Sequence, residues 1–205
     1  MISRRRFMGQ LRDSRFTELE YIEATGTQYI DTKYICSEDT KIEIDFSVSA
    51  YSIFHSLFGT AGTKATNRFV AQLYKMEEIQ ARIGVDVKQI PFEFEIGQRY
   101  VLIQSKWALN VNDTELGDWT NDNTRFTKDA NSLYLMAINN KTPTNSYTYL
   151  FKGRIYSFKI YESNILAMDL IPVLDSSRVP CFYDKISNKF LYNKGTGEFS
   201  YAYKQ

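Results

Sequence analysis

Hydrophobic and polar positions alternate along much of this chain, which is the pattern of a strand with one buried and one wet face. The clearest case is the stretch 41–48, in which Ile42, Ile44, Phe46 and Val48 share one face and charged or polar residues occupy the other. A half-buried strand of this kind is typical of an antiparallel sheet.

The same pattern predicts further strands at short spacing, and glycine-bearing or polar loops separate them. These strands are expected around 19–22 and over 27–31, 56–59, 68–74, 78–83, 89–94, 99–105, 108–112 and 133–138. The stretch 151–199 adds strands over 155–161 and 165–173, and it holds more aromatic residues than one exposed hairpin can use. We therefore expect it to pack across the rest of the chain. With no helical periodicity longer than a couple of turns, the sequence predicts an all-β, two-sheet antiparallel sandwich.

Composition and charge narrow the class of protein. The 205 residues are 43% hydrophobic and 15% aromatic, which is enough for a folded core. A net charge of +1 argues against nucleic-acid binding. The chain has no apolar run of about 18 residues, so membrane insertion is not expected. It also lacks the apolar segment of a signal peptide, so export by that route is not expected.

The two cysteines, Cys36 and Cys181, lie far apart in the sequence. They allow either a disulfide or two buried free thiols. In a chain without a secretion signal, free thiols are the favoured alternative.

Residues 1–16 differ in composition from the rest of the chain and are expected to form a basic N-terminal arm, with the sandwich over 17–205. The arm has five arginines and one aspartate, a net charge of +4, which leaves −3 for the remainder. It is either a disordered tail or a docking peptide that orders on a partner. The docking hypothesis rests on Arg4, Arg5, Arg6, Phe7, Met8, Leu11 and Arg12.

The stretch 21–32, which reads YIEATGTQYIDT, resembles the opening of a group of phage and prophage proteins. Their bodies belong to the concanavalin A-like (laminin G-like) lectin/glucanase superfamily. The likeness covers about residues 18–200, and its opening and closing motifs are more specific than its middle. Lys33 departs from the pattern, because the group usually has glycine there. The other matching segments are 57–59, 99–102, 108–115, 151–161, 170–172, 182–184, 188–190, 193 and 195–199.

This resemblance implies a jelly-roll sandwich that acts in a virion, as head or tail decoration or in host attachment. It implies other virion proteins as partners of the arm, assembly as a homo-oligomer, and synthesis in the cytoplasm of a bacterial host. It supplies no catalytic residues and no cofactor. Gly26 and Gly153 have a structural explanation, since one suits a tight turn and the other a strand with no room for a Cβ atom.

A glycoside hydrolase is the least favoured hypothesis. Glucanases of this fold place three acidic residues on one strand face, and Glu43 and Asp45 begin such a pattern. Ser47 and Val48 fill the positions where the next acid should stand, so the two carboxylates are expected to mark a wet strand face. His55, the single histidine, has no neighbouring signature of a catalytic triad.

Carbohydrate binding is the main alternative to a virion role, and a host-surface glycan would be the ligand. Sugars stack on aromatic faces and bond to polar side chains of loops at one end of a sandwich. Trp119 is expected to be exposed in such a loop, whereas Trp107 is expected in the core. Oxygens of the same loop could also hold Ca²⁺, with Asp118, Asp122 and Asn123 as donors. The candidate sugar-binding residues are Trp119, Asp118, Asn121, Asp122, Asn123 and Arg125.

Overall fold

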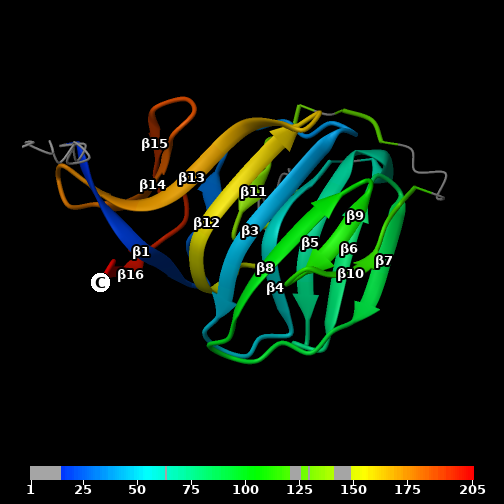
Figure 1. Cartoon of the computed structure of the whole chain (residues 1–205), viewed down its shortest axis with the longest axis horizontal. Coiled ribbons are helices and arrows are strands. Elements are labelled where there is room, and N and C mark those ends of the chain that lie inside the picture. The colour runs from blue at the N-terminus through cyan, green and yellow to red at the C-terminus, as the bar shows by residue number, and fades with distance from the viewer. Residues whose placement is uncertain (1–14, 63, 121–125, 129, 141–148) are drawn as a thin grey trace, which may run out of the picture.

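Two antiparallel sheets packed face to face form a jelly-roll sandwich in the computed structural model (Figure 1). The structure describes residues 15–205 apart from 63, 121–125, 129 and 141–148. The all-β sandwich expected from the sequence is confirmed. In the described ranges, the only helical element is one 3-10 turn, η1 (Ala65–Asn67).

Within the described residues, sheet A has ten strands and sheet B has six. The spatial order in sheet A is β10 (Thr114–Gly117), β9 (Ala108–Val111), β8 (Arg99–Ser105), β3 (Thr40–Val48), β12 (Lys152–Glu162), β1 (Phe16–Thr25), β13 (Ile165–Asp175), β14 (Pro180–Asp184) and β15 (Lys189–Leu191), with β16 (Ser200–Tyr203) paired to β1. Sheet B has the order β2 (Ile30–Asp31), β11 (Tyr134–Leu135), β4 (Phe54–Ala61), β5 (Arg68–Tyr74), β6 (Glu78–Ile83) and β7 (Asp86–Pro91).

The core lies between the two sheets, as the alternation along β3 predicts. The apolar residues of 42–48 are all fully buried. Phe58 of sheet B meets Phe158 of sheet A with 6.0 Å between ring centroids, and Phe46 meets Phe151 at 6.2 Å. Each buried aromatic removes a large apolar area from water, so these contacts are a main source of stability.

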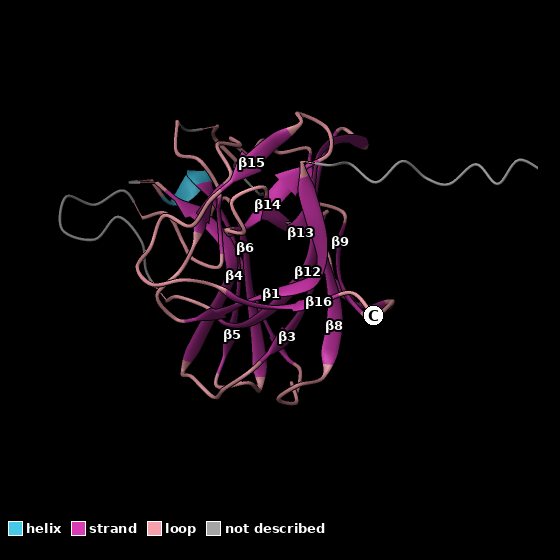
Figure 2. Cartoon of the chain, turned by 90° about the vertical axis from the view of Figure 1, so that its left-hand side faces the viewer, coloured by secondary structure: helices cyan, strands magenta, loops and turns pink. Residues whose placement is uncertain are grey.

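The C-terminal segment packs across the chain, as the sequence predicts. β12 and β13 pair with each other at one end of the sheet. At the other end they separate, and β1 lies between them and pairs with both. On its other edge β12 pairs with β3 along nine residues, and the last strand, β16, pairs with β1 beside the C-terminus (Figure 2).

The opening and closing motifs of the resemblance form one hydrogen-bonded unit. The Thr27 carbonyl accepts from the Thr196 amide at 2.9 Å, and the Tyr29 carbonyl accepts from the Lys194 amide at 2.9 Å. Gln28 Nε2 donates to the Glu198 carbonyl at 2.9 Å. The expected turn is also present, since Gly26 has φ +96°. Both motifs therefore serve to join the N-terminal and C-terminal parts of the sandwich.

Glycine is expected at two positions, 153 and 33, but only position 153 has it. A Cβ atom on Gly153 would lie 2.2 Å from the Ser47 carbonyl oxygen, so the expected lack of room is confirmed. Lys33, which stands where the resembling proteins have glycine, adopts φ 61°. Its amide donates to Asp31 Oδ1 at 3.0 Å, which helps to hold the left-handed conformation.

Three expected strands differ from those observed, and the one expected over 133–138 shortens to Tyr134–Leu135. The strand predicted over 89–94 is β7, which runs from Asp86 to Pro91, because a tight turn at Gly84 (φ 62°) starts it earlier. Phe92 and Phe94 then leave the sheet and pack against Tyr100, with ring centroids 6.0 and 5.0 Å away. The strand predicted over 27–31 shortens to Ile30–Asp31, because the preceding residues bond to the C-terminal tail.

Cys36 and Cys181 are both buried and free, so the preferred alternative is confirmed. Phe16, which the sequence places at the end of the arm, is instead the first residue of β1 and pairs with Asp175 of β13, and Arg15 also contacts the sandwich. Arg15 Nη2 donates to the Tyr183 hydroxyl at 2.6 Å, and the Phe16 ring packs on Tyr183 at 4.5 Å. The docking residues Arg4, Arg5, Arg6, Phe7, Met8, Leu11 and Arg12 lie outside the described residues.

Candidate functional site

The two tryptophans lie in the opposite environments from those expected. Trp119 is fully buried and belongs to the main core, so the prediction of an exposed sugar contact is wrong. Its backbone amide donates to the Lys106 carbonyl at 2.9 Å, which folds the loop after β10 over the end of the sandwich. Trp107, expected in the core, is 64% exposed at the turn between β8 and β9.

The other candidate residues of the 118–125 loop gather into no described site. Asp118 Oδ1 accepts from the Thr120 amide at 2.7 Å, which is a local turn contact. Asn121, Asp122, Asn123 and Arg125 lie outside the described residues, and the Ca²⁺ hypothesis depends on two of them. In the described part of the chain, no three His, Cys, Asp or Glu side chains gather to hold a metal ion.

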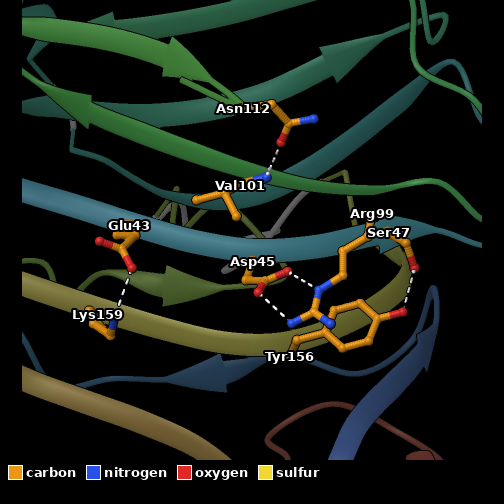
Figure 3. A network of polar contacts seen from close by, with 8 residues as sticks. All are labelled: Glu43, Asp45, Ser47, Arg99, Val101, Asn112, Tyr156 and Lys159. Carbon is orange, nitrogen blue, oxygen red and sulfur yellow. Dashed lines mark hydrogen bonds and ion pairs between the residues drawn. The ribbon is translucent and has the colours of Figure 1, made fainter. Parts of the chain in front are cut away.

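The acidic residues of β3 lie on the outer face of sheet A, as expected, and each has a basic partner (Figure 3). Asp45 accepts two hydrogen bonds of 2.7 Å from Arg99, and Glu43 accepts one of 2.7 Å from Lys159. Figure 3 also shows Arg99 beside Tyr156, with the guanidinium carbon 4.0 Å from the ring centroid. This face therefore offers neutralised carboxylates rather than the acid pair of a glucanase.

His55 has a structural environment. Its Nδ1 atom accepts from the Lys152 amide at 3.3 Å, and its ring lies edge-on to Phe151 at 5.8 Å. No carboxylate pairs with it among the described residues, so nothing there forms a triad. Burial, and then the positive charge of Lys152, lower the pKa of His55 to about 4.

We expect this histidine to make stability depend on pH. Its pKa is about 4 when folded and 6.5 by reference, so between these values the unfolded chain binds the additional proton. Stability is therefore lost as pH falls from about 6.5 to about 4, by about 3 kcal/mol. Urea unfolding across that range measures the loss. In a His55→Asn variant, which keeps an acceptor for the Lys152 amide, the loss should be smaller, and an equal loss would contradict this assignment.

The outer face of sheet B holds a hollow of about 460 Å³, within the usual size range of small-ligand pockets. Its floor consists of small or apolar residues of β4 and β5 and of Ile138. Gly59 has no side chain to fill the space between its neighbours, because a Cβ atom there would lie 2.9 Å from Ile138 Cγ1 and 3.2 Å from Val70 Cγ2. Long side chains stand around the floor, so the depression arises from a change in side-chain size across the sheet. The lining residues are Phe54, Ala61, Gly62, Arg68, Val70, Gln72, Gln80, Arg82, Ile138, Asn140 and Tyr149.

The register of β5 and β6 brings the polar lining residues together. Gln72 lies opposite Gln80, and its Nε2 atom donates to Gln80 Oε1 at 2.7 Å. Arg82 lies opposite Val70, which makes Arg68 its diagonal neighbour on the same face. Diagonal neighbours are separated by about 7–8 Å, within reach of long side chains.

An aromatic cluster borders the other end of the hollow. The Phe54 ring packs on Tyr74 at 5.1 Å and on Tyr149 at 4.6 Å, and Tyr149 is 49% exposed. The hollow thus combines an apolar floor, amide and guanidinium donors, and exposed aromatic surface. This combination is typical of sites that bind small polar ligands with some apolar surface.

A second hollow of about 430 Å³ lies beside the exposed Trp107, at the end of sheet A. Two lysines line it. Lys106 is ion-paired with Glu38 and lies 5.5 Å from the Trp107 ring centroid, and the Nζ atom of Lys41 lies 4.3 Å from the Tyr161 ring centroid. Both cations of this second hollow therefore already have a partner within the chain. The arginines of the sheet B hollow have no such carboxylate partner among the described residues, which makes it the stronger candidate site.

The sheet B hollow was not predicted from the sequence, although part of the signal is present there. The strands 68–74 and 78–83 are predicted. Period-2 alternation places Arg68, Val70 and Gln72 on one face of the first strand, and Gln80 and Arg82 on one face of the second. The sequence alone does not show that pairing of the two strands puts all five residues on the same face of the sheet.

Comparisons with known proteins support the fold. No protein-family model matches the chain, and no curated protein matches it by sequence. Among solved structures, a candidate carbohydrate-binding protein from Bacteroides ovatus matches with a TM-score of 0.61 and 11% identity, over 90% of this chain and 60% of its own. The CBM40 domain of an IT-sialidase from Ruminococcus gnavus, solved with α2,3-sialyllactose, matches with a TM-score of 0.55 and 13% identity, over 69% of this chain and 89% of its own.

These neighbours are carbohydrate-binding sandwiches rather than catalytic domains, and they are consistent with the concanavalin A-like fold. They give no support to a virion role. The chain spans about 60% of the length of the Bacteroides ovatus protein. In the part of the chain that the structure describes, no helix is both long and apolar enough to cross a membrane.

Proposed function

We propose that this protein is a non-catalytic carbohydrate-binding module whose ligand occupies the hollow on the outer face of sheet B. The observation that carries the proposal is the hollow itself, where polar donors surround an apolar floor. Sugars present both hydroxyl groups and apolar C–H surface, and this lining matches both. The carbohydrate-binding neighbours add support at the level of the fold.

The charge pattern favours this function over glycoside hydrolysis. The carboxylates of β3 are on the opposite sheet and are paired with Arg99 and Lys159. Retaining and inverting glycosidases both need two carboxyl groups that flank the scissile bond. None of the described residues that line the sheet B hollow is acidic.

Filling the hollow should abolish glycan binding. Ala61 is partly exposed in the lining, so an Ala61→Trp side chain would occupy the space without entering the core. Ile103→Trp is the matched control, because Ile103 lies on the outer face of sheet A opposite Glu43. A glycan array followed by calorimetric titration should show binding by the wild type and by Ile103→Trp, but not by Ala61→Trp. An array with no signal for the wild type would overturn the proposal.

The virion role stays a prediction, because the arm residues on which it depends are outside the described part. It is compatible with glycan binding, since an attachment protein would use such a site on a host surface. Deleting residues 1–14 and measuring incorporation into particles tests it separately from the hollow.

A further inference from the structure

The two arginines of the sheet B hollow differ from the other arginines that the structure describes. Arg15 and Arg178 donate to tyrosine hydroxyls, and Arg99 and Arg154 form ion pairs with carboxylates. Among the described residues, no ion pair or side-chain hydrogen bond involves Arg68 or Arg82. The two guanidinium groups without such partners are thus neighbours in one hollow.

Burial makes this arrangement unfavourable in the absence of a ligand. The Nε atom of Arg68 is buried without a hydrogen-bond partner. Burial, and then the positive charge of Arg68, lower the pKa of Arg82. A guanidinium group keeps its proton in proteins, so the repulsion and the desolvation are not relieved by deprotonation.

The acidic residues nearest in sequence do not neutralise the pair. Glu78 shares the outer face of β6 but lies four residues from Arg82, about 13 Å along the strand. Its carboxylate accepts from Gln80 Nε2 at 2.8 Å. Asp86 lies opposite Ile83, a core residue, so the alternation of β7 directs it to the inner side.

We propose that Arg68 and Arg82 bind the carboxylate of an acidic sugar, with the hydroxyl groups of the same ligand on Gln72 and Asn140. Guanidinium groups recognise carboxylates through parallel charge-assisted hydrogen bonds, and two adjacent arginines supply more donors than one carboxylate needs. This inference rests on the proposed function, and it specifies that the glycan is anionic.

The test compares α2,3-sialyllactose, a hexuronic acid oligosaccharide, lactose, and inorganic sulfate as ligands of the full chain in calorimetric titrations. The wild type should bind at least one of the two acidic glycans. Arg68→Gln and Arg82→Gln should each weaken that binding about tenfold or more. Arg99→Gln, which removes the same charge from the opposite sheet, should leave the affinity unchanged.

Thermal unfolding separates loss of binding from loss of fold. Arg82→Gln breaks no ion pair and relieves a repulsion, so its Tm should equal or exceed that of the wild type. Arg99→Gln should lower Tm slightly, because it breaks the pair with Asp45. A lower Tm for Arg82→Gln would show that the arginine has a structural role and would contradict the proposal.

The remaining outcomes distinguish this inference from the proposed function. Binding of a neutral glycan that Ala61→Trp abolishes, but that both arginine variants keep, would overturn only the inference. Sulfate that binds as tightly as the acidic glycans would also overturn it, because the site would then recognise charge alone. If no glycan binds at all, the proposed function fails with it.

Discussion

Replacing Trp119 by alanine should lower the free energy of unfolding by about 3–5 kcal/mol, the usual loss for a large buried aromatic. The side chain is fully buried in the main core, so its removal leaves a cavity that the surrounding strands fill only in part. The sequence-based hypothesis expects the opposite outcome, with glycan binding lost and stability unchanged. Urea unfolding of Trp119→Ala decides between the two.

Trp107→Ala is the matched control, since its side chain is 64% exposed. It should change stability by no more than about 0.5 kcal/mol. Trp119→Phe should lower the free energy of unfolding by an intermediate amount. The Nε1 atom of Trp119 is buried without a hydrogen-bond partner, so a phenyl ring loses packing contacts but no hydrogen bond. Trp119→Ala with wild-type stability would show that the loop after β10 does not cover the core.

The faces of the strands could be predicted from the sequence because alternation is a local property. Along β3 each apolar residue falls in the core and each charged residue on the outer face, and no other part of the chain is needed to see it. The burial of the two cysteines and the lack of room for a Cβ atom at Gly153 could also be predicted, because residue type and local sequence context are enough to indicate both.

The environment of a loop residue could not be predicted in the same way. Trp119 stands among polar residues in the sequence, but its loop folds back so that its amide bonds to Lys106. Trp107 follows an alternating strand, but it occupies the turn to β9, where the side chain leaves the sheet. In both cases a long-range contact or a chain reversal outweighs local polarity.

The candidate site, too, could be predicted from the sequence only where local alternation determines it. Local alternation indicates which residues of β5 and β6 point the same way. It does not show that Gly59 and Ala61 of β4 form the floor next to them, or that no carboxylate of the described residues pairs with Arg68 or Arg82. Those features depend on the order of strands in sheet B, which arises from pairings between distant segments.

Gly195→Ala should lower the free energy of unfolding by about 3 kcal/mol, the upper part of the usual range for overpacking. A Cβ atom on Gly195 would lie 1.9 Å from the carbonyl oxygen of Thr27 and 2.9 Å from its carbonyl carbon. Both atoms belong to the backbone, so no side-chain rotation relieves the contact. The same carbonyl accepts from the Thr196 amide at 2.9 Å, and a shift of the tail would weaken that bond.

Gly97→Ala provides the control, because it separates backbone strain from steric overlap. Gly97 has φ +82°, and a Cβ atom there would have no neighbour within 4 Å, so alanine should cost only about 1–2 kcal/mol of left-handed strain. Urea unfolding of the two variants gives the comparison. A smaller loss for Gly195→Ala than for Gly97→Ala would mean that the closing motif does not dock on the opening motif. A larger loss would instead support a role for these two motifs in stabilising the sandwich by joining its N-terminal and C-terminal parts, which is a structural reason for their sequence.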